Sequence, residues 1–86
     1  MDNKVLIKLV IPELDDSFDL FIPVNVTIYK LKNLLYRSLE ELCGIDLLNK
    51  SSTLINKINS RIYQNDEIVI NTDIRNASEL LLIFDK

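Results

Sequence analysis

Histidine is absent from this 86-residue sequence, and cysteine and glycine each occur once. Without histidine the chain lacks the usual general base and the commonest metal ligand. One cysteine with no histidine partner is a poor candidate for a nucleophile or a zinc site. One glycine also excludes the glycine-rich loops that hold phosphates in nucleotide-binding folds. We therefore expect no enzyme: no catalytic residue, no cofactor-binding residue and no metal site.

Clustered basic residues and long apolar runs are missing too. The chain has ten basic and thirteen acidic residues, a net charge of -3, and nucleic-acid binding needs clustered Lys and Arg, so no nucleic-acid partner is expected. No stretch approaches the roughly 18 to 20 apolar residues of a membrane span. The N-terminus runs directly into a predicted strand without a signal-peptide pattern. We expect a cytoplasmic protein with no membrane span.

The apolar residues that are present predict several strands. Val5 to Ile11 and Phe18 to Pro23 each have an apolar residue at every second position, on either side of a turn, which is typical of the two strands of a hairpin. The later elements are two short strands of a small hairpin, a helical turn and a last strand: Thr53 to Asn56, Arg61 to Tyr63, Asp66 to Ile70 and Ser78 to Phe84.

One helix is predicted from Ile28 to about Cys43. Thr27 is suited to cap its N-terminus, and Gly44 stands where a left-handed C-terminal cap is wanted. Cys43 falls on the apolar stripe, so we expect a buried, unreactive thiol. The rest of the stripe consists of Ile28, Leu31, Leu34, Leu35, Leu39 and Leu42. The opposite face, which we interpret as solvated, carries Lys30, Lys32, Asn33, Arg37, Glu40 and Glu41.

These elements form a single domain, residues 1–86, because the chain is long enough for one two-layer core only. Their order is ββαββ, a turn, then β. The predicted fold class is α+β: a mixed β-sheet packed on one main α-helix in the β-grasp arrangement. Two acidic pairs, Asp15 with Asp16 and Asp66 with Glu67, lie in expected turns, and we interpret them as solvated and not as metal ligands.

The alternation in the strands leaves apolar residues on the sheet face away from the helix. Contiguous apolar surface of several hundred Å² usually marks an interface, so this face predicts a protein-interaction patch that also supports weak self-association. The alternative is that loops, or the Ile45 to Ser52 connection, cover it. The residues assigned to this face are Leu6, Val10, Phe21, Leu81 and Ile83, with Ile55 beside them.

The whole chain resembles ubiquitin in the order and spacing of these motifs. Thr27-Ile28 looks like the opening of the ubiquitin helix, and Asp66 to Ile74 looks like its turn with two apolar anchors, here Val69 and Ile74. The resemblance implies a recognition patch at Leu14, Ile55, Leu81 and Ile83, with Leu81 in place of a histidine. The chain ends Phe84-Asp85-Lys86 without the diglycine tail that conjugation requires, so conjugation is not expected.

Among stand-alone bacterial ubiquitin-like proteins, the chain resembles the YukD/EsaB-like family of type VII secretion accessory proteins. The motifs are Lys4 to Leu9, Asp19 to Pro23 with the helix soon after, and Asn76 to Ile83. The resemblance implies a non-conjugated ubiquitin-like module that binds a protein of the secretion machinery and regulates or assists it. The alternative is a modifier or sulfur-carrier relative whose tail is lost or processed.

Overall fold

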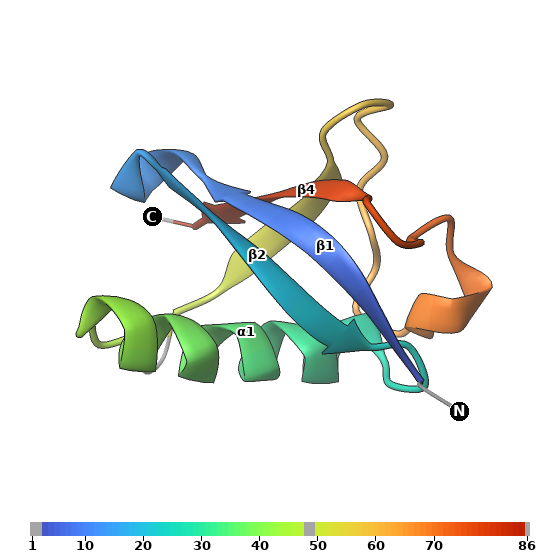
Figure 1. The fold of residues 1–86 in the computed structure, drawn as a ribbon, viewed down its shortest axis with the longest axis horizontal. Coiled ribbons are helices and arrows are strands. Elements are labelled where there is room, and N and C mark those ends of the chain that lie inside the picture. Colours follow the sequence, from blue (N-terminus) through green and yellow to red (C-terminus); the bar gives the residue numbers. More distant parts are fainter. Residues whose placement is uncertain (1–2, 48–49, 86) are drawn as a thin grey trace.

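One helix lies against one face of a mixed β-sheet in the computed structural model of this chain, which describes residues 3–47 and 50–85 (Figure 1). Within those residues the sheet has four strands, ordered β2-β1-β4-β3. The elements are β1 (Lys4–Ile11), the 3₁₀ turn η1 (Pro12–Leu14), β2 (Asp16–Pro23), α1 (Ile28–Cys43), β3 (Ser52–Asn56), the 3₁₀ turn η2 (Val69–Asn71) and β4 (Glu79–Phe84). This is the predicted ubiquitin-like β-grasp fold.

The pairing of β1 with β4 joins the two ends of the chain. These strands run parallel, with Leu9 opposite Leu80, whereas β1 pairs antiparallel with β2 and β3 pairs antiparallel with β4. The helix supplies the crossover that such a parallel pair requires. Both edges of the sheet are therefore formed by antiparallel strands, β2 on one side and β3 on the other.

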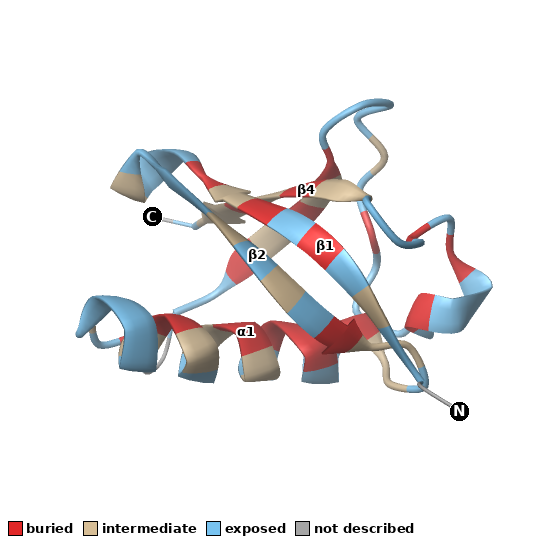
Figure 2. Ribbon diagram, in the orientation of Figure 1, coloured by how far each residue is buried: buried red, intermediate tan, exposed pale blue. Residues whose placement is uncertain are grey.

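Local signals set both ends of α1 as predicted. The Thr27 hydroxyl accepts a hydrogen bond from the Lys30 amide at 3.2 Å, and Gly44 adopts a left-handed φ of 68° while its amide donates to the Glu40 carbonyl. In Figure 2 the buried side of α1 faces the sheet and the exposed side faces away from it. The core between these layers is almost entirely aliphatic and includes the two predicted anchors, Val69 and Ile74.

Three helix residues differ from the prediction. Cys43 and Leu42 are exposed and not buried, because burial of the stripe ends at Leu39 and the last helical turn faces solvent. Lys32 is buried and not solvated, with 8% of its surface exposed, because its position at the margin of the stripe faces β3.

The second hairpin is less regular than predicted. Ile62 forms a single antiparallel bridge with Ile55, and the segment from 61 to 63 is not a full strand. Two hydrogen bonds nevertheless hold it beside β3: the Asn56 amide donates to the Arg61 carbonyl at 2.8 Å and the Tyr63 amide to the Leu54 carbonyl at 3.0 Å. The predicted helical turn is η2, which begins at Val69 instead of Asp66. Across residues 3–47 and 50–85, no helix has the length and apolarity needed to cross a membrane.

Candidate interaction surface

A continuous apolar row crosses the outer face of the sheet. The strand register places Val10 opposite Leu81 and Leu81 opposite Ile55, and the bridge adds Ile62 after Ile55. Residues paired across strands point to the same face, and the intervening residues of the three strands are buried against the helix. Val10, Leu81, Ile55 and Ile62, here called the apolar row, therefore lie side by side on the surface away from α1. Ile83 adjoins the row, two positions beyond Leu81 on the same strand face.

A charged row lies next to the apolar row. Lys8 is opposite Asp19 on one side and Glu79 on the other, so the charges alternate across β2, β1 and β4. Lys57 continues the alternation, with its Nζ 3.7 Å from Glu79 Oε1. Opposite charges directly across strands stabilise a sheet by about 0.2 to 1 kcal/mol per pair. The outer face is therefore not uniformly apolar.

The structure brings together only part of the predicted patch. Val10, Ile55, Leu81 and Ile83 form one cluster. Leu6 and Phe21 face each other across β1 and β2, with Phe21 70% exposed, but the charged row separates them from the cluster. Leu14 lies in η1 and packs against the core from the hairpin end, where the neighbouring Glu13 carboxylate accepts a hydrogen bond from the Phe84 amide at 2.7 Å.

Ile62 is a member of the row that the sequence interpretation missed. Its side chain is 54% exposed. The signal was present in the predicted hairpin itself: if 53–56 and 61–63 pair around a four-residue connection, Ile62 falls opposite Ile55 and points the same way. Counting inward from the turn would have found it.

A polar network holds the irregular hairpin that presents Ile62. The Tyr63 hydroxyl donates to Asp73 Oδ1 at 2.5 Å and accepts from Asn56 Nδ2 at 3.1 Å. Arg61 bridges Glu67, at 2.6 Å, and Asp73, at 3.5 Å. Burial, together with the hydrogen bond to Asp73, raises the pKa of Tyr63 to about 12. The same hydrogen bond lowers the pKa of Asp73 below its usual value. These interactions connect both ends of the segment from 56 to 73 to Tyr63 and Arg61.

The comparisons with known proteins agree with the fold. No family model matches the chain, and no curated protein matches its sequence. Among solved structures, the ubiquitin-like domain of the Mycobacterium tuberculosis type VII secretion protein EccD1 superposes with a TM-score of 0.70 at 14% identity, covering 93% of this chain and 97% of that one.

Two further structures have the same fold. The ubiquitin-like domain of Plasmodium falciparum Dsk2 gives a TM-score of 0.70 at 13% identity over 95% of this chain and 99% of that one. A designed protein based on ubiquitin gives 0.69 at 17% identity over 100% and 94%. At these identities the similarity establishes the ubiquitin-like fold and nothing more specific.

Proposed function

We propose that this chain is a ubiquitin-like protein-interaction module that serves as a cytoplasmic accessory of a bacterial type VII secretion system and binds its protein partner through the apolar row. The observation that carries the proposal is the alignment of Val10, Leu81, Ile55 and Ile62 across the outer face of the sheet. The similarity to the EccD1 domain and the resemblance to YukD/EsaB-like proteins support the secretion context.

The composition of the row suits reversible binding. Burying one Leu or Ile side chain contributes about 1.5 to 3 kcal/mol at most. Three of the four members, Val10, Ile55 and Leu81, are already half-buried, and Ile62 is exposed. Association costs several kcal/mol of lost freedom before any net affinity remains. A surface of this size therefore fits a transient contact, and the adjacent charged row supplies orientation more than strength.

The test uses Ile62→Asp with Ile70→Asp as its matched control. Ile70 lies in η2, outside the apolar row, and is 55% exposed against 54% for Ile62. The wild-type chain and Ile70→Asp, used as bait in extract of the native host, should recover a type VII secretion component. Ile62→Asp should not recover it.

A secretion assay completes the test. Deletion of the gene should impair export of type VII substrates, and expression of Ile70→Asp, but not of Ile62→Asp, should restore it. Unchanged export after deletion, together with a wild-type bait that recovers no secretion component, would overturn the secretion role. Equal recovery by the two variants would overturn the apolar row as the binding surface.

A further inference from the structure

The apolar row has its centre between two strands. It crosses the sheet in the order Val10, Leu81, Ile55 and Ile62. Its centre therefore lies between Leu81 of β4 and Ile55 of β3. A two-fold axis that runs along the strands at this centre would place a second copy of the chain face to face with the first. Leu81 would then meet Ile55 of the second copy, and Val10 would meet its Ile62. Every member of the row would be covered by an apolar residue, as a self-complementary two-fold contact requires.

The charged row fits the same arrangement. Glu79 of β4 would meet Lys57 of the second copy, and Lys57 would meet its Glu79. Within one chain these side chains are neighbours, with 3.7 Å between Lys57 Nζ and Glu79 Oε1, and they are 47% and 34% exposed. Because neighbouring charges in the row have opposite signs, reversing the row about this centre brings opposite signs together. The charges of two copies are therefore complementary.

Another two-fold axis would also stack the apolar row on itself, but it is unfavourable for the charges. This axis runs across the strands, along the row, and places the charged border of one copy over the opposite border of the other. Glu79 would then lie over Ile83 of the second copy, which stands four positions further along β4 on the same face. A carboxylate covered by an apolar side chain loses water without gaining a hydrogen-bond partner. The charged row therefore selects the axis along the strands.

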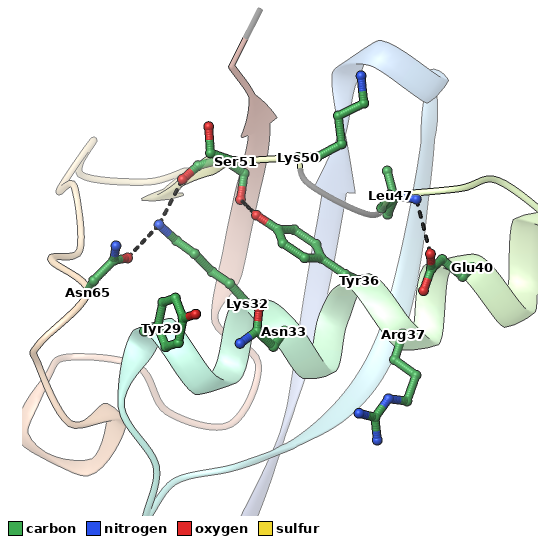
Figure 3. A pocket seen from close by; sticks show the side chains of 11 residues that line it. Tyr29, Lys32, Asn33, Tyr36, Arg37, Glu40, Leu47, Lys50, Ser51 and Asn65 are labelled. Carbon is green, nitrogen blue, oxygen red and sulfur yellow. Dashed lines mark hydrogen bonds between the residues drawn. The ribbon is translucent and has the colours of Figure 1, made fainter.

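The helix side of the molecule offers no equivalent surface beside β3. A hollow of about 500 Å³ lies there, between α1 and the start of β3 (Figure 3). Leu47 is the only aliphatic residue among the described residues that line it. Lys32 Nζ donates to the Ser52 carbonyl at 2.7 Å and to Asn65 Oδ1 at 2.8 Å, so these polar groups pair within the chain. Apolar association of two copies is therefore favoured on the outer face.

We propose that two copies of this chain form a weak dimer through the outer faces of β4 and β3, with a two-fold axis that runs along the strands between Leu81 and Ile55. Ile83, which pairs with Thr53 in its own chain, meets Thr53 of the second copy on the border away from the charges. The dimer covers the apolar row, so a secretion protein that binds this row has to displace the second copy. The row is then kept from water in both states.

The test reverses one charge at a time and measures association by sedimentation velocity. Lys57→Glu sets glutamates against each other between the two copies, and Glu79→Lys sets lysines against each other. Each variant alone should dimerise about tenfold more weakly than the wild type. An equimolar mixture should dimerise about as tightly as the wild type, because each chain then meets the opposite sign. Both variants keep a negative net charge, since each reversal changes the value of -3 by two, so attraction between oppositely charged chains does not explain a mixed dimer.

Recovery in the mixture separates contacts between chains from effects within one chain. The ion pair of Lys57 with Glu79 is lost in both variants and is not restored by mixing. The mixed dimer is identified by a fluorophore on Cys43 of one variant, because this cysteine is exposed at the end of α1, away from the outer face. Formation of the mixed dimer also shows that both variants are folded.

A second pair of variants tests the apolar row. Ile62→Asp should weaken the dimer about tenfold, because Val10 of the second copy then meets a carboxylate. Ile70→Asp, at an equally exposed position outside the row, should weaken it by less than about twofold.

Three results would overturn the proposal. A wild-type chain that stays monomeric at every accessible concentration would exclude the dimer. A mixture that associates no more tightly than its components would show that Lys57 and Glu79 do not face each other between copies. Equal weakening by Ile62→Asp and Ile70→Asp would place the contact outside the apolar row. None of these measurements involves a host protein, so the dimer can fail or succeed independently of the secretion role.

Discussion

Replacement of Tyr63 by Phe tests the network that holds the second hairpin. The Tyr63 side chain is 2% exposed, and its hydroxyl joins two partners: it donates to Asp73 at 2.5 Å and accepts from Asn56 at 3.1 Å. Phe keeps the ring in the core and removes only the oxygen. The change leaves the Asn56 side-chain amide without that acceptor in a buried position and leaves the Asp73 carboxylate without its shortest donor.

The expected loss follows from these two bonds. A hydrogen bond to a charged group contributes about 1.5 to 3 kcal/mol, and a buried donor left unpaired adds to the cost of removing it. Tyr63→Phe should therefore lower the free energy of unfolding by about 2 to 3 kcal/mol at neutral pH, measured by urea denaturation. Tyr29→Phe is the control. Tyr29 is 60% exposed, so removal of its hydroxyl should change the free energy of unfolding very little.

The pH dependence makes the test specific to the hydroxyl proton. The pKa of Tyr63 is raised from 10.0 to about 12 in the folded state, by burial first and then by the hydrogen bond to Asp73. A pKa raised by folding means that the folded state holds its proton more tightly, so the stabilisation is complete below pH 10 and is lost as the pH rises toward 12. The rise of the pKa from 10.0 to about 12 corresponds to roughly 3 kcal/mol of stability lost as the pH rises through this range.

The stability difference between wild type and Tyr63→Phe should therefore be constant up to about pH 9 and shrink between pH 10 and pH 12. Subtracting the variant removes the contributions of all ionisable groups that the two proteins share. A difference that is large but independent of pH would refute the reasoning, because it would assign the loss to packing of the ring and not to the protonated hydroxyl.

Three further predictions concern the last strand, the helix end and acid stability. Leu82→Asp should unfold the domain because Leu82 is fully buried, whereas Ile83→Asp should leave the thermal melt nearly unchanged and abolish weak self-association in sedimentation. Equal destabilisation by the two variants would show that the Ile83 side chain, next to the apolar row, does not point to solvent. Gly44→Ala should lower the free energy of unfolding by about 1 kcal/mol in urea denaturation. An alanine Cβ at this position meets no atom within 4 Å, so the cost comes only from the left-handed φ of 68°. An increase in stability would contradict this explanation. The hydrogen bond from Tyr63 lowers the pKa of Asp73 from 3.8. The Asp73 carboxylate therefore stabilises the fold above pH 4, and this stabilisation is lost as the pH falls through the folded-state pKa. Asp73→Asn should remove this part of the loss of stability in acid, measured by unfolding curves at decreasing pH.

The helix and the first hairpin could be predicted because their signals are local. Thr27 and Gly44 identify the ends of α1 through backbone chemistry that acts within one turn, and the structure has the helix at Ile28–Cys43. The hairpin of β1 and β2 follows from period-two alternation around the Pro12 to Asp15 turn. In each case the residues that decide the structure are close together in the sequence.

The environment of single residues could not be predicted from the same patterns. Cys43 and Leu42 continue the apolar spacing of the helix, but spacing does not state where the sheet ends, and the last turn lies beyond the buried stripe. Lys32 is buried because the carbonyl of Ser52 and the amide of Asn65, which are 20 and 33 residues away, accept hydrogen bonds from it. Such partners come from tertiary packing and leave no mark near Lys32 in the sequence.

The division of the outer face depends on a register that only the folded chain defines. Alternation placed Leu6, Val10 and Leu81 on one face, but it did not fix which residue of β1 lies opposite which residue of β4. The parallel register puts Lys8 opposite Glu79 and Val10 opposite Leu81. The charges thus form a row of their own beside the apolar row. A partner that buries the apolar row must also meet alternating charges along one border, and a partner docked in the reverse direction would place like charges together there. The two rows together therefore determine the orientation of a bound protein, which neither row could do alone.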